Sequence, residues 1–146
     1  HTFELLQHPR TMLSLGDGGA HCGYICDASL PTFMLTHWTR DRTRGEKLPL
    51  ELIVKRQTSS TAAIYGLHDR GLIKPGYLAD FNLIDYDRLA LHAPHFIADL
   101  PAGGRRIVQE ADGYLATIKA GEAIFENGQA TGAMPGKLIR GPQNAG

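Results

Sequence analysis

This chain contains the stretch Thr11-Met12-Leu13-Ser14-Leu15-Gly16-Asp17-Gly18-Gly19-Ala20-His21, and that stretch decides how the rest is interpreted. A short apolar run leads one aspartate, Asp17, directly into a glycine-rich turn. A run of this length bounded by glycines predicts a buried strand over Thr11–Leu15. Asp17 would lie at the open end of that strand, where a carboxylate can take a proton from a water molecule. An aspartate before two glycines is also a common turn former, and both interpretations stay open at this level.

Helices are predicted on both sides of this stretch. Residues Phe3–Gln7 read as a helix end, with a break at His8-Pro9-Arg10. After a loop over Gly16–Ala28, Ser29 is a suitable N-cap with Pro31 in the first turn, which predicts a helix through about Asp41. Trp38 on this helix is interpreted as a packing anchor, with the floor of a substrate pocket as the alternative.

Two further helices follow a charged turn over Arg42–Lys47. The apolar spacing of Leu48–Arg56 predicts a helix that begins at the proline. A third helix is predicted over Ser60–Tyr65, and Gly66 is a suitable left-handed cap for its end.

From Gly71 onward, turns and short strands replace helical patterns. A strand is predicted over Ala79–Asp85, and a hairpin over Tyr114–Lys119 and Glu122–Glu126. Asn127-Gly128 is the strongest short turn signal in the chain. These strands predict a small antiparallel sheet with an unpaired edge, which favours self-association.

Composition excludes several classes of protein. Hydrophobic residues make up 42%, charged residues 21%, and the formal net charge is zero, so neither a disordered chain nor a polyanion-binding protein is indicated. We therefore expect no nucleic-acid partner. No apolar run approaches the roughly 20 residues of a membrane span, so no membrane partner is expected either.

Cysteines and histidines give few metal signals. Cys22 and Cys26, the only cysteines, are interpreted as buried or half-buried free thiols, which fits a reducing cytoplasm. His92-Ala93-Pro94-His95 places two imidazoles close together, but a third ligand is not near, so we interpret it as a solvated loop. His68-Asp69-Arg70 resembles a catalytic dyad on paper, although Asp69 and Arg70 are better explained as residues that pair with neighbours and fix a turn.

Several segments together resemble the D-aminoacylase (N-acyl-D-amino-acid deacylase) family of the amidohydrolase superfamily. Gly16–His21 resembles its eighth-strand aspartate and the loop that follows. Leu67–Asp85 resembles the stretch where such enzymes leave the barrel for a small β domain. Asp99–Gly104 and Gly132–Gly141 are similar to its closing segments.

The resemblance implies an α+β fold: the C-terminal remnant of a (β/α)₈ barrel, with its last strand and helices, followed by a small antiparallel sheet that is part of a β-sandwich. The corresponding domains are residues 1–66 and residues 67–146. A whole barrel needs about 200 residues or more, so the chain is expected to be a C-terminal fragment that is inactive alone.

The implied activity is metal-dependent hydrolysis of a small-molecule amide, most specifically deacylation of an N-acyl-D-amino acid. Zn²⁺ is the implied cofactor; it activates water and polarises the carbonyl. Asp17 is the implied general base and acid, and a metal ligand if other ligands come from outside this chain. His21 is a candidate substrate-binding residue, with a structural role as the alternative.

One departure from the family weakens the D-amino-acid assignment. Such enzymes place an arginine soon after the aspartate to bind the substrate carboxylate, whereas Gly18–Thr39 contains neither Arg nor Lys. A cyclic amide substrate therefore stays open. So does a non-catalytic role as an assembly module.

Overall fold

The computed structural model describes residues 1–13, 16–19 and 21–142. The chain forms two compact units whose segments alternate along the sequence. Unit 1 comprises His1–Leu13, Pro49–Ile84 and Tyr114–Gly146, and unit 2 comprises Ser14–Leu48 and Asp85–Gly113. The predicted division into residues 1–66 and 67–146 stays a prediction.

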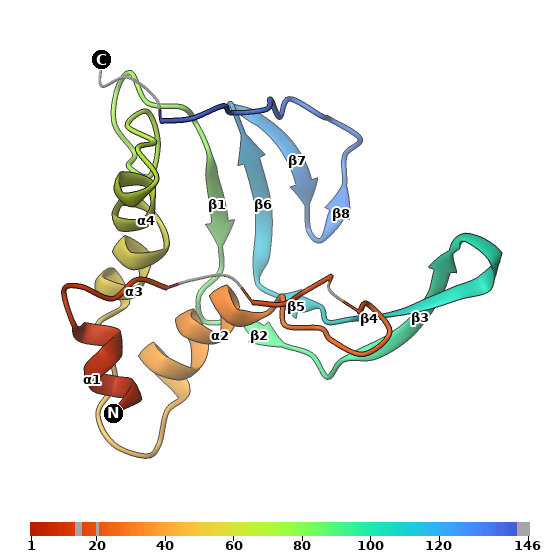
Figure 1. Ribbon diagram of the computed structural model, residues 1–146, viewed down its shortest axis with the longest axis horizontal. Helices are drawn as coiled ribbons and strands as arrows, with labels where there is room; N and C mark the ends of the chain where they lie inside the picture. Colours follow the sequence, from red (N-terminus) through yellow and green to blue (C-terminus); the bar gives the residue numbers. More distant parts are fainter. Residues whose placement is uncertain (14–15, 20, 143–146) are drawn as a thin grey trace. The chain divides into compact units, whose positions relative to one another are not determined.

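Unit 1 contains an antiparallel sheet of four strands in the order β1-β6-β7-β8 (Figure 1). Its strands are β1 (Phe81–Ile84), β6 (Tyr114–Lys119), β7 (Glu122–Glu126) and β8 (Gln129–Ala130). The predicted hairpin over β6 and β7 is confirmed with the same bounds, and the predicted strand over Ala79–Asp85 is confirmed in its central part. The fold is therefore a mixture of helices and small antiparallel sheets.

Tight turns with two left-handed residues join the last strands of this sheet. Asn127 and Gly128 between β7 and β8 have φ of 47° and 79°, and Ala120 and Gly121 between β6 and β7 have φ of 53° and 85°. Two positive φ values in a two-residue loop match the right-handed twist of the flanking strands. Alanine seldom adopts this conformation, and here the carboxylate of Asp80 accepts a hydrogen bond of 2.8 Å from the Ala120 N–H.

Three helices complete unit 1: α1 (Thr2–Gln7), α3 (Leu50–Gln57) and α4 (Ser59–Ile64). All three were predicted, with shifts of one or two residues at most of the ends. α3 buries Ile53 completely. α4 ends in a Schellman motif, because Leu67 N–H donates to Ala62 C=O at 2.8 Å and Gly66 N–H to Ala63 C=O at 3.1 Å, with Gly66 at φ 68°.

In the described residues of unit 2, the regular structure is one helical segment and two short ribbons. The helix α2 (Leu30–Thr36) continues into a π-helical turn over His37–Asp41. The ribbons pair β2 (Ala90–Leu91) with β5 (Ala111–Asp112), and β3 (His95–Leu100) with β4 (Gly104–Val108). A short turn over Pro101–Gly103 connects β3 to β4. The buried core of this unit is made of apolar side chains: Met34, Leu35, Trp38, Leu48 and Leu89. The prediction of Trp38 as a packing anchor is confirmed.

Three sequence predictions need correction. The strand predicted over Thr11–Leu15 is not present over Thr11–Leu13. The hydroxyl and the N–H of Thr11 donate hydrogen bonds to carbonyl groups at the end of α1, and these bonds hold the segment against the helix. Ser14 and Leu15 lie outside the described residues. Ser29 precedes α2 as predicted, but its side chain makes no capping hydrogen bond. His95 belongs to β3 and not to a loop.

Large apolar side chains remain exposed on both units. Ile73 and Met134 of unit 1 expose 96% and 91% of their surface, and Tyr24 of unit 2 exposes 84%. Among the described residues, no helix has the length and apolar character needed to cross a bilayer.

Candidate functional site

The loop that carries Asp17 is shaped by glycines that lie against its other limb. A Cβ atom at Gly16 would lie 2.1 Å from the Asp27 carbonyl oxygen, and one at Gly18 would lie 3.1 Å from the Ala28 backbone nitrogen. The first distance is far below any real Cβ contact, so residue 16 must be glycine for the chain to pass here. Asp17 is therefore held between two glycines whose positions are set by backbone packing.

Backbone hydrogen bonds fix the remainder of this loop. The His21 carbonyl accepts hydrogen bonds from Tyr24 N–H at 2.7 Å and Ile25 N–H at 3.0 Å, which closes one turn. The Cys22 carbonyl accepts a hydrogen bond of 2.8 Å from Ile107 N–H on β4. The loop is thus attached to a strand more than 80 residues further along the chain.

The side chains of Asp17 and His21 are both exposed. The Asp17 carboxylate is therefore accessible to solvent. His21 has φ of 47°, a conformation that is uncommon for residues other than glycine and that occurs often at turns and functional sites. The general base role of Asp17 and the substrate-binding role of His21 stay predictions.

Cys22 and Cys26 are free thiols and half-buried, as predicted. Within the described part of the chain, no three His, Cys, Asp or Glu side chains gather closely enough to hold a metal ion. The described residues thus do not make a metal site by themselves, and Asp17 would be one ligand at most.

The two histidine motifs have structural partners. His92 Nε2 lies 3.0 Å from Asp112 Oδ2, across the ribbon formed by β2 and β5. Arg70 donates to Asp69 at 2.8 Å and 3.2 Å and lies 3.6 Å from Asp80, so the prediction that these residues pair with neighbours is confirmed. This pairing keeps the pKa of the Asp69 carboxyl below its ordinary value, chiefly through the Arg70 hydrogen bond.

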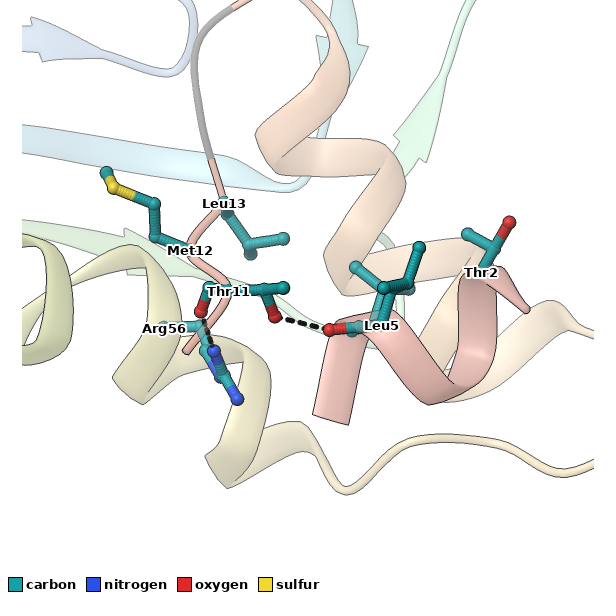
Figure 2. A pocket seen from close by; sticks show the side chains of 7 residues that line it. Thr2, Leu5, Thr11, Met12, Leu13 and Arg56 are labelled. Carbon is teal, nitrogen blue, oxygen red and sulfur yellow. Dashed lines mark hydrogen bonds between the residues drawn. The ribbon is translucent and has the colours of Figure 1, made fainter. Parts of the chain in front are cut away.

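A small pocket of about 200 Å³ lies between α1, the segment after it and α3 (Figure 2). Most of its lining is apolar, and its cation, Arg56, donates to the carbonyls of Thr11 and His8. Figure 2 shows the Thr11 hydroxyl bonded to the Leu5 carbonyl on one side and Arg56 bonded to the Thr11 carbonyl on the other. The volume is below the roughly 300 Å³ of typical ligand sites, and Thr11 and Arg56 already have partners within the protein, so we interpret this pocket as a gap in the packing of the scaffold.

Comparison with known proteins defines the relationship of the chain. The model of a family described as "Amidohydrolase family" matches residues 1–125, which is most of the chain. The chain belongs to the amidohydrolase family. Among curated proteins, adenine deaminase 1 of Rhizobium meliloti (strain 1021) is 31% identical over 101 residues, which cover 60% of this chain. The matched region spans 18% of the length of that relative. No solved structure matches the chain.

Proteins of the amidohydrolase family are generally metal-dependent. The match extends over the Asp17 loop and β6, so it includes segments of both units. Sequence reasoning overlooked Asp80, which forms an ion pair with Lys119 and receives the Ala120 hydrogen bond. Its partners lie about 40 residues away, so no local pattern reveals them.

Proposed function

We propose that this chain is the C-terminal part of a metal-dependent amidohydrolase that hydrolyses a non-peptide amide, with N-acyl-D-amino acids as its substrates. The family match is the observation that supports hydrolysis of a carbon–nitrogen bond. The resemblance of the Asp17 loop and the closing segments to D-aminoacylases supports the narrower substrate. The matched region covers 18% of the length of adenine deaminase 1, so the activity of the whole protein is part of this proposal, as is the inactivity of this chain alone.

Asp17 acts as general base and then as general acid in this proposal. Its exposed carboxylate takes a proton from the attacking water and later gives that proton to the departing nitrogen, so that the amide yields a carboxylic acid and an amine. His21, in the same loop, binds the substrate. The residues that the structure describes hold no group of three metal-ligating side chains, so we assign no step to Zn²⁺ here.

A second candidate is hydrolysis of the bond between a heterocyclic ring and its exocyclic amino group, which releases ammonia, as the name of adenine deaminase 1 suggests for that relative. Two observations favour it. The identity of 31% extends over 101 residues, and Gly18–Thr39 lacks the arginine or lysine that would bind a substrate carboxylate. Adenine carries no carboxylate, so the lack of an Arg or Lys in this segment would not weaken the binding of such a substrate.

The two activities separate in one experiment on the natural protein that includes these residues. The purified enzyme is supplied with a panel of N-acetyl-D-amino acids and, separately, with adenine. Released primary amine reports the first activity, and released ammonia reports the second. The proposal expects release of primary amine from the N-acetyl-D-amino acids. If only adenine is converted, the second candidate function replaces the proposal.

Asp17→Asn tests the catalytic role. We expect kcat to fall by about 10²–10⁴, because that is the usual contribution of a general acid or base. Asp27→Asn is the matched control, since Asp27 is an exposed aspartate in the same loop and its carboxylate has no role in the proposal. His21→Ala should raise KM with little change in kcat. Full activity in Asp17→Asn would contradict the mechanism.

Self-association and a cytoplasmic location complete the proposal. Exposed apolar side chains such as Ile73 and Met134 favour association with a second copy, and the free thiols Cys22 and Cys26 suit a reducing compartment. A protein that forms stable oligomers but hydrolyses neither substrate would support the alternative of a non-catalytic assembly module. Light scattering together with the activity panel distinguishes these outcomes.

A further inference from the structure

An open pocket of about 380 Å³ in unit 1 gathers four cationic side chains. Arg70 comes from the turn after α4, and Lys119 from the end of β6. Lys137 and Arg140 come from the segment that follows β8. The volume lies within the range of roughly 300–1,000 Å³ that small-molecule sites occupy.

Two of these cations are neutralised within the protein. Both carboxylate oxygens of Asp80 lie 2.9 Å from Lys119 Nζ, and one lies 3.6 Å from Arg70 Nη1. Asp69 forms a second, closer pair with Arg70. Burial alone would raise the pKa of Asp80, but the hydrogen bonds from Lys119 and Ala120 outweigh it and keep this pKa below its ordinary value. Both carboxylates are therefore charged at neutral pH.

The other two cations have no carboxylate partner among the described residues. Lys137 and Arg140 are exposed, and no Asp or Glu in the described ranges lies within ion-pair distance of either. Four cations against the two carboxylates Asp69 and Asp80 leave an excess of two positive charges at the pocket. In a partly enclosed site such an excess attracts anions more strongly than isolated surface charges do.

The rest of the lining is apolar. It is formed by Leu78, Ala120, Pro135, Leu138 and Ile139, and Leu138 exposes 77% of its surface. Cations beside uncovered aliphatic side chains match a ligand with an anionic end and an apolar body. A purely inorganic anion would leave these apolar side chains in contact with water.

We propose that this pocket binds a small aliphatic carboxylate. Lys137 and Arg140 contact the carboxylate, while Leu78 and Leu138 contact the aliphatic chain. Arg70 and Lys119 form the rigid wall, because Asp80 fixes them against the turn between β6 and β7. This inference goes beyond the proposed hydrolase activity and uses none of the residues assigned to it.

Titration calorimetry with hexanoate, hexanol and inorganic phosphate tests the proposal on the purified protein. We expect saturable binding of hexanoate that weakens as salt increases, and at least tenfold weaker binding of hexanol. Phosphate should also bind at least tenfold more weakly, because it lacks the aliphatic chain. Equal binding of hexanoate and hexanol, or of hexanoate and phosphate, would overturn the assignment.

The double variant Lys137→Ala/Arg140→Ala should lose at least tenfold in hexanoate affinity. Both side chains are exposed, so an unchanged far-UV circular dichroism spectrum is expected and verifies the fold. Lys55→Ala, an exposed lysine on α3, is the matched control and should bind as the unmodified protein does. The proposal is wrong if the double variant keeps its affinity, if the control loses as much, or if hexanoate does not bind.

Discussion

Replacing Asp80 by asparagine removes one negative charge from the turn between β6 and β7 and leaves its shape unchanged. Asparagine can still accept the Ala120 N–H through its amide oxygen. It loses the charged contacts of 2.9 Å with Lys119 and the longer one with Arg70. The substitution therefore isolates the ionic part of this network from its role as a hydrogen-bond acceptor.

The expected loss follows from the exposure of the pair. A hydrogen bond to a charged group contributes about 1.5–3 kcal/mol when buried, and an exposed ion pair about 0.2–1 kcal/mol. The side chains of Asp80 and Lys119 are 21% and 30% exposed, which lies between these cases. We expect Asp80→Asn to lower the free energy of unfolding by about 1–2 kcal/mol at pH 7.

The effect should depend on pH in one direction. Because folding lowers the pKa of Asp80, its ionic contribution is complete above its ordinary pKa of about 3.9 and disappears as pH falls through the lowered value. Urea unfolding followed by far-UV circular dichroism at pH 7 and near pH 2 measures the difference between the two proteins. That difference should shrink at low pH. An equal difference at both values would refute the ionic explanation.

Two pairs of substitutions, each with its control, test packing. Ile53→Ala should lower the free energy of unfolding by about 2–5 kcal/mol, because Ile53 is fully buried in α3. Val54→Ala is its control and should lower it by less than about 1 kcal/mol, because Val54 is 45% exposed. Urea unfolding measures both losses. Gly113→Ala should cost about 2–4 kcal/mol, because its Cβ would lie 2.7 Å from Leu89 Cα at φ +93°. Gly103→Ala is the control: at φ +71° and with nothing within 4 Å of the added Cβ, it introduces backbone strain but no clash. It should therefore lower the free energy of unfolding less than Gly113→Ala does, as measured by Trp38 fluorescence during unfolding. Equal losses in the two variants would contradict the steric argument.

Local signals explain which elements were predicted from the sequence. The ends of α4 and β7 depend on Gly66 and on Asn127-Gly128, whose conformational preferences act over a few residues. The strand predicted over Thr11–Leu15 was wrong in its described part because the Thr11 hydroxyl finds carbonyls in α1, a tertiary contact that periodicity does not contain.

Misleading local signals and non-local contacts both explain what was missed. No strand was predicted for the local hairpin of β3 and β4, because Pro94 precedes it and Pro101-Ala102-Gly103 connects its strands, and such residues are typical of loops. At the candidate site, the sequence drew attention to Asp17 but not to the contact between Gly16 and Asp27, which determines how the loop is held. The cationic pocket joins residues 70, 119 and 137–140, and separations of this size leave no local pattern.

The alternation of the two units along the chain has a consequence for truncation. The polypeptide leaves unit 1 after Leu13, returns at Pro49, leaves again after Ile84 and returns at Tyr114. No single cut therefore yields either unit whole, and each must close long loops before it is complete. Such long-range closure slows folding relative to a helical protein of the same length, and it makes shortened versions from either end poor substitutes for the entire sequence.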